Sequence, residues 1–233
     1  MKKIILMLLI CLNAVLLAEA NKLDRESSDY KYTSVGIHFV ESDKSGFAVN
    51  LSIDLPGAFY VTLERKADGV DYKKESYDKV IDTARLGVHM GIGDLISNMS
   101  SGDVNLKVKN LFDVFAEAGI KTSDFDGERF NFEGDDSHAS FIAGIRFGNS
   151  NHWEGKVFLD TSKEAIITDS GNPVCRALSC PPYDAELSDD SDKKFGIGVL
   201  YNINKRSAIF LEATSSKVID NSFKLGYQLN FWE

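Results

Sequence analysis

The chain has 233 residues, in which 35 acidic side chains exceed 26 basic ones and give a formal net charge of −9. Nucleic-acid-binding proteins usually carry the opposite balance, so the composition disfavours that class. The length suits a single domain, and all-β barrels commonly reach it.

The first twenty residues have the three parts of a secretory signal peptide. Lys2 and Lys3 precede an apolar run over residues 4–17, and Ala18-Glu19-Ala20 provides a small-x-small cleavage site. The apolar run is shorter than the roughly 18 to 20 residues that a membrane-spanning helix needs. We predict that residues 1–20 are a signal peptide and that residues 21–233 form one exported β-barrel domain.

From Tyr30 onward, ten segments alternate large apolar residues with small, polar or charged ones. A period of two places these two classes on opposite faces of a β-strand. We therefore expect strands at residues 30–41, 47–54, 59–64, 85–92, 112–119, 141–147, 153–160, 195–202, 208–213 and 222–231.

The connections between these segments alternate in length. Short turns are expected at residues 42–44, 55–57, 149–151 and 204–206, and in the second of these Pro56 and Gly57 supply backbone angles that a reversal needs. Long polar connections are expected at residues 66–79, 121–136 and 162–192, whereas the path of residues 93–105 stays open. Alternating short and long connections with an even number of strands are typical of transmembrane β-barrels.

The expected fold class is all-β, an antiparallel up-and-down transmembrane β-barrel of ten strands. Eight strands is the alternative if the first hairpin or residues 93–105 are misread. Strands of about ten residues can cross a membrane at a tilt, and aromatic residues near the strand ends suit its interfaces: Tyr30, Tyr32, Trp153, Tyr201, Phe231 and Trp232. A soluble barrel or sandwich shares the period of two. The signal peptide, and a polar face rich in glycine and opposite charges, favour the membrane.

The last segment is the most regular of the ten. Large apolar residues alternate there with polar residues or glycine, and two further residues follow them: Phe223, Leu225, Tyr227, Leu229, Phe231, then Trp232 and Glu233. This pattern resembles the small outer-membrane β-barrel proteins of Gram-negative bacteria, the OmpA-like transmembrane domains and their porin-like relatives.

The resemblance implies that the protein lies in the cell outer membrane and contacts its lipid bilayer. It also implies that the outer-membrane barrel assembly machinery recognises the last strand, with Phe231 as the terminal aromatic. Members of the family usually end on that aromatic, so Trp232 and Glu233 are a departure. We expect a monomer without a cofactor.

The polar face of the expected barrel carries many ionisable residues. They are Asp54, Glu64, Arg85, His89, Asp113, Glu117, Arg146, Glu154, Lys156, Asp160, Glu212 and Lys224, together with His38. A small barrel can be filled by its own side chains, and unpaired buried charges are costly, so these residues are expected to form a structural plug. A narrow ion or solute pathway is the alternative.

Other residues with possible chemistry lie outside the alternating segments. Cys175 and Cys180 are expected to form a disulfide in an exported chain, because two thiolates without a nearby histidine make a poor zinc site. Two acidic groups have the spacing of calcium ligands without completing an EF-hand loop: Asp124, Asp126 and Glu128, and Asp189, Asp190 and Asp192. His138 lies beside acids and serines, but no catalytic motif surrounds it.

The function expected from the sequence is that of a non-catalytic outer-membrane barrel, with a structural or surface-interaction role through its outer loops. The alternative is a narrow porin-like channel for ions or small solutes. An outer-membrane enzyme or a soluble periplasmic binding protein is more remote.

Overall fold

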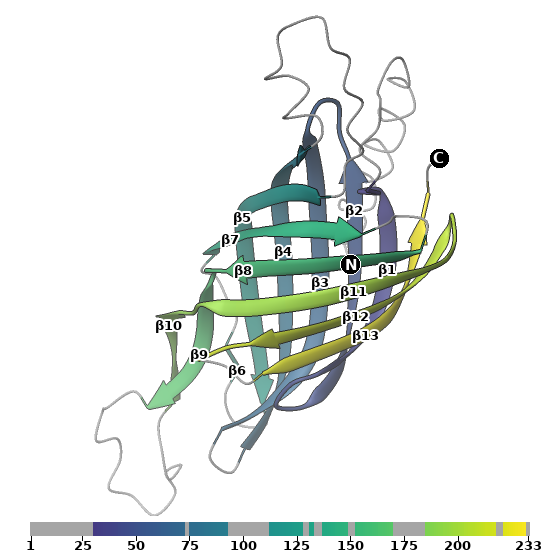
Figure 1. The fold of residues 1–233 in the computed structure, drawn as a ribbon. Helices are drawn as coiled ribbons and strands as arrows, with labels where there is room; N and C mark the ends of the chain where they lie inside the picture. The colour runs from purple at the N-terminus through teal and green to yellow at the C-terminus, as the bar shows by residue number, and fades with distance from the viewer. Residues whose placement is uncertain are drawn as a thin grey trace, which may run out of the picture.

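The computed structural model describes residues 30–72, 75–92, 112–127, 131–132, 137–148, 152–169, 185–217 and 221–231. Ten strands of this part form the barrel (Figure 1): β1 (Ser34–Glu41), β2 (Ser45–Asp54), β3 (Phe59–Tyr72), β4 (Glu75–Gly91), β5 (Phe112–Gly127), β7 (His138–Gly148), β8 (Trp153–Asp160), β11 (Lys194–Asn204), β12 (Ser207–Ser215) and β13 (Ser222–Asn230). Among the described residues, no helix is long and apolar enough to cross a membrane.

The barrel is closed and entirely antiparallel. Each strand pairs with its neighbours in the chain, and β4 pairs with β5. The ring closes where β1 pairs with β13, from Ser34 opposite Asn230 to Glu41 opposite Phe223. The structure therefore confirms the predicted barrel of ten strands rather than eight, and the last strand, β13, lies between β12 and β1.

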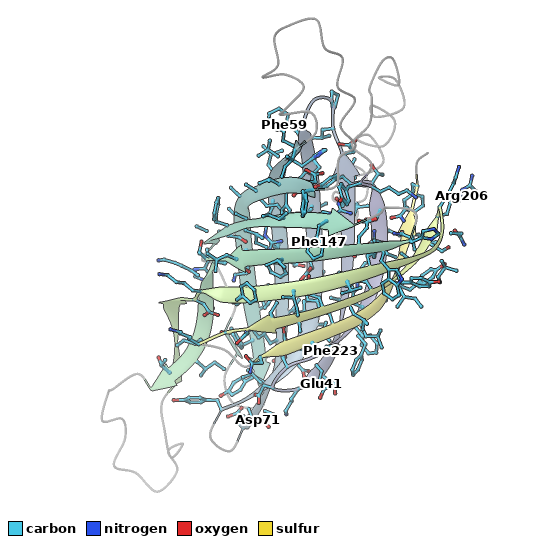
Figure 2. The ribbon with its side chains drawn as sticks, viewed as in Figure 1. Glu41, Phe59, Asp71, Phe147, Arg206 and Phe223 are labelled. Carbon is cyan, nitrogen blue, oxygen red and sulfur yellow. The ribbon has the colours of Figure 1, made fainter. Side chains whose placement is uncertain are left out.

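The two faces of the strands differ as the alternation predicts. Each of the ten barrel strands exposes large apolar side chains on the outside, among them Ile37, Phe47, Phe59, Leu86, Val114, Phe141, Trp153, Ile197, Leu211 and Leu225. Figure 2 shows the side chains of the barrel, with Phe59, Phe147 and Phe223 labelled on three of its strands. The interior instead holds buried charged and polar groups such as Asp113, Glu154 and Glu212.

Strands β3, β4 and β5 are longer than the sequence predicts. Residues 66–79 and 121–127 were expected in loops, but most of them continue the β-sheet, with Lys66 opposite Ile81 and Lys79 opposite Phe125. The period of two disappears there because the outer face becomes polar and the inner face mixes apolar with charged side chains, whereas backbone pairing continues. On the outer face, the pair Arg65–Asp82 at 3.7 Å marks the end of the apolar belt.

The hairpin between β3 and β4 projects beyond the barrel, at the end opposite Arg206 (Figure 2). Lys44 Nζ lies 2.7 Å from the Asp71 carboxylate, and the Ser76 hydroxyl donates to the same carboxylate. These two donors hold the pKa of Asp71 below its ordinary value. We call this end of the barrel the hairpin end, and the end that carries Tyr30 and Phe231 the terminal end.

Two further segments differ from the sequence prediction. Tyr30 to Thr33 do not extend β1 but lie buried at the terminal end of the barrel. The connection over residues 162–192 contains a second hairpin, β9 (Lys163–Asp169) and β10 (Ala185–Ser191). The tight turn at Leu55-Pro56-Gly57 is confirmed, with Gly57 at a positive φ of 88°. A two-residue strand, β6 (Asn131–Phe132), pairs with the end of β5.

Candidate solute pathway: the barrel lumen

A row of alternating charges crosses one wall of the lumen. Glu212 on β12 lies directly opposite Lys224 on β13, which places their side chains on the same inner face. Lys224 Nζ lies 3.0 Å from Glu64 Oε1 and 3.8 Å from Glu212 Oε1. Lys156 Nζ on β8 lies 2.6 Å from Glu212 Oε2. We call these four residues the charge ladder, in which each acid contacts a lysine.

A second polar group lies on the wall formed by β3, β4, β5 and β7. The Arg85 guanidinium lies 3.5 Å from Glu117 Oε2 and donates from Nε to Ser140 Oγ at 2.7 Å. Glu117 also accepts a hydrogen bond of 2.9 Å from the Tyr60 hydroxyl. Ser140 in turn lies 2.9 Å from Ser162, whose backbone N–H donates to Asp160.

The terminal end of the lumen is closed by aromatic rings. The Tyr32 ring stacks on His89 with centroids 3.9 Å apart and lies 4.4 Å from the ring of Tyr60. The Arg146 guanidinium lies 4.6 Å from the centroid of Tyr32 and 5.2 Å from that of Tyr30. We call these five residues the tyrosine plug.

Buried acids hold the tyrosine plug in place. The Tyr32 hydroxyl donates to Asp113 at 3.0 Å, and Asp113 is 0% exposed. His89 lies between Asp113, at 3.3 Å, and Asp54, at 3.8 Å. Arg146 pairs with Glu154 at 2.5 Å and also donates to the backbone carbonyl of Lys31 at 3.1 Å. The segment before β1 is thus attached to several strands of the barrel wall.

Apolar side chains narrow the lumen at the hairpin end. The inward-facing Tyr77 and Phe125 are buried against Ala165 of β9, and partly buried apolar residues pack around them: Val70, Tyr72 and Ile167. The hairpin of β9 and β10 therefore packs against the inner face of the extended strands β3, β4 and β5. We call these six residues the hairpin-end cluster.

A cavity of about 530 Å³ lies in the lumen; the tyrosine plug borders it at the terminal end, and its lining reaches the hairpin-end cluster and Asp71 at the other. Its lining includes the whole charge ladder, Arg85 with Glu117, and Tyr32 with Arg146 at the terminal end. The apolar residues Phe115, Phe158 and Phe210 line it as well. The described side chains therefore do not fill the lumen throughout.

The ionisable residues that the sequence places on the polar face lie inside the barrel, in three groups. Glu64, Lys156, Glu212 and Lys224 form the charge ladder; Arg85, Glu117 and Asp160 lie around Ser140 and Ser162; and Asp54, Asp113 and Glu154 lie beside His89 and Arg146 of the tyrosine plug. His38 lies 2.7 Å from Asn50 Oδ1, with its ring 5.0 Å from that of Phe210, and lines the same cavity as the charge ladder.

The roles of Tyr30 and Tyr32 were predicted wrongly. We expected both at a membrane interface, but their rings are buried in the lumen, whereas Trp153 and Tyr201 are exposed, with ring centroids 4.5 Å apart, and suit an interface. The alternation of β1 carries a signal for this placement. Ile37 and Phe39 face outward, so the even-numbered positions of β1 face inward, and Tyr30 and Tyr32 also have even numbers.

Several other predictions concern residues that are described only in part. Cys175, Cys180, Glu128, Trp232 and the signal peptide lie outside the described residues, as do the side chains of Asp189 and Asp190. Asp124 and Asp126 are exposed on one face of β5, and His138 is buried at the beginning of β7. Within the described ranges, no group of three or more His, Cys, Asp or Glu residues could hold a metal ion.

Comparisons with known proteins give only distant similarities. No protein-family model matches the chain, and no curated protein matches it. Among solved structures, a KdgM porin is 9% identical with a TM-score of 0.42, over 86% of this chain and 100% of that one. A NanC porin is 9% identical with a TM-score of 0.34, over 85% and 99% of the two chains. A CymD monoaromatic hydrocarbon channel is 9% identical with a TM-score of 0.26, over 88% and 90%. We draw no functional conclusion from similarities at this level.

Proposed function

We propose that this protein is a non-catalytic outer-membrane β-barrel whose lumen forms a narrow passage for small solutes. The observation that carries the proposal is the orientation of the two faces, apolar outside and charged inside. A water-soluble barrel has the reverse arrangement, and monomeric soluble proteins rarely expose contiguous apolar patches larger than a few hundred Å². An apolar belt around a closed barrel with a polar interior is what a transmembrane barrel requires.

The signal peptide at residues 1–20 and the aromatic last strand support the outer membrane as the location. Phe223, Leu225 and Tyr227 face outward on β13, where lipid and the assembly machinery would contact them. Lys224 faces the lumen between them and pairs with Glu64. The last strand thus combines a lipid-facing row with a lumen-facing charge.

The cavity favours passage over a purely structural role. A structural plug would fill the interior with paired side chains, whereas about 530 Å³ of the lumen is free of them. The tyrosine plug borders this cavity at the terminal end and is where the proposed path would open. Its central ring, Tyr32, belongs to a segment outside the barrel wall, so that ring can move without breaking the β-sheet.

Two measurements test this proposal. Fractionation of expressing cells should recover the protein with the outer membrane and in detergent extracts; a soluble monomer in the periplasmic fraction would overturn the membrane assignment. The refolded protein in planar lipid bilayers should then give small single-channel steps, and Tyr32→Ala should enlarge them. If neither the wild type nor Tyr32→Ala gives single-channel steps after insertion, the proposed passage is refuted and a structural role remains.

A further inference from the structure

The charged groups around the cavity nearly compensate one another, because nine lysine and arginine side chains line it against eight aspartate and glutamate side chains. The charge ladder holds two carboxylates and two ammonium groups, and Arg85 with Glu117 and Arg146 with Glu154 add one charge of each sign. A solute with a net charge would have to leave one member of such a group without its partner, which is costly in a confined space. A solute that carries one positive and one negative charge can pair its ammonium with the acid and its carboxylate with the base of such a pair. Every charged group then keeps a partner of opposite sign.

Aromatic rings line the same cavity and lie close against the wall. An added Cβ at Gly196 would lie 2.1 Å from Phe158 Cζ, and one at Gly144 would lie 2.7 Å from Phe115 Cζ. The rings therefore occupy space that any larger residue at the two glycines would take. Glycine at these positions lets the rings lie close against the wall, so that the lumen beyond them stays free for the apolar part of a solute.

Lys156 joins the charge ladder to the aromatic wall. Its ammonium lies 2.6 Å from Glu212, 4.6 Å from the ring centroid of Phe158 and 5.6 Å from that of Phe210. A carboxylate beside aromatic faces is the environment that binds ammonium groups. The Lys156 side chain is 31% exposed and that of Glu64 is 25% exposed, so a solute can reach one ammonium and one carboxylate of the charge ladder.

We infer that the cavity is a binding site for small zwitterionic amino acids with apolar or aromatic side chains. The solute carboxylate pairs with Lys156 or Lys224, its ammonium pairs with Glu64 or Glu212, and its side chain packs against Phe158 and Phe210. The volume lies within the range of about 300 to 1,000 Å³ that is usual for small-molecule sites. The inference rests on the proposed function for the route by which the solute enters.

The test is isothermal titration of the refolded protein in detergent with four probes. L-Phenylalanine should bind, whereas 3-phenylpropanoate, which lacks the ammonium, and phenethylamine, which lacks the carboxylate, should bind at least tenfold more weakly. Glycine, which lacks the side chain, should also bind at least tenfold more weakly. Equal affinity for either singly charged probe, or no binding of L-phenylalanine to folded protein, would overturn the inference.

Variants then locate the site. Lys156→Met should weaken L-phenylalanine binding at least tenfold, and Lys217→Met, which changes a lysine outside the cavity lining, should leave it unchanged. Equal losses in both variants would contradict the placement. If Lys156→Met does not fold, the four probes on the wild type still decide the inference. If the protein conducts but binds all four probes equally, the binding-site inference is wrong and the proposed passage stands. If it binds L-phenylalanine selectively but does not conduct, the proposed passage is wrong and the binding site stands.

Discussion

Removing one charge from the charge ladder should make the passage selective for ions of one sign. Lys224→Met leaves the two carboxylates of the charge ladder, Glu64 and Glu212, with one lysine, Lys156. The ladder then has one surplus negative charge. For an ion about 6 Å away, Coulomb's law gives about 0.7 kcal/mol at an effective dielectric constant of about 80, and about 2.8 kcal/mol at about 20. These energies correspond to a roughly threefold to hundredfold change in local ion concentration. The variant should therefore prefer cations.

Reversal potentials in a KCl gradient across a planar bilayer measure this selectivity. The wild type should give a reversal potential near zero, because its charged groups are compensated. Lys224→Met should shift it in the direction of cation preference, Glu64→Gln should shift it in the opposite direction, and Lys217→Met should leave it unchanged. Shifts of the same sign in both ladder variants, or no shift in either of them while both conduct, would refute the placement of the charge ladder along the path.

Three further predictions concern the ring wall, the tyrosine plug and the lipid face. Gly196→Ala should push the Phe158 ring into the lumen, lower the conductance and cost about 1–3 kcal/mol of unfolding free energy in urea titrations from lipid vesicles; unchanged conductance would contradict the close packing. Tyr32→Phe should lose about 1.5–3 kcal/mol of unfolding free energy, because Asp113 loses a buried hydrogen-bond donor. The variant should keep the wild-type conductance in bilayer recordings, and larger steps would show that the hydroxyl, rather than the ring, closes the path. Leu225→Arg should lower the unfolding free energy by about 2–4 kcal/mol if the residue lies near the membrane midplane. The same urea titrations measure this change against the control Leu225→Ile. Equal stabilities of these two variants would argue against a lipid-facing row.

The inner and outer faces of the strands could be predicted from the sequence because each barrel strand has an apolar outer face and a polar inner face. This contrast is local, so Trp153 and Glu154, or Phe223 and Lys224, reveal their directions without knowledge of their neighbours. Strand number and order followed for the same reason. The alternation between an apolar outer and a polar inner face holds over the apolar belt and ends at Arg65 and Asp82, beyond which the outer face is polar and the inner face is mixed.

Pairing between distant residues could not be predicted from the sequence. Nothing local indicates that Lys224 reaches Glu64, or that Lys156 shares Glu212 with it, because these contacts depend on the curvature and shear of the closed barrel. The predicted structural plug consisted of charged side chains and did not include Tyr32, whose ring packs at the terminal end. The prediction also missed the cavity beyond, because the volume left by the side chains depends on ring packing against Gly144 and Gly196.

The pairing of β1 with β13 has a consequence for how the protein folds. The first strand of the barrel finds its second partner only when residues 222–230 arrive, after every other barrel strand in the chain. Until then, any partly assembled sheet has two unpaired edges, which are sites of aggregation. Pairing between strands so far apart in the chain is also slow, because the whole intervening chain must be ordered first. Closure by the last strand is therefore the step at which a curved sheet with open edges becomes a sealed cylinder.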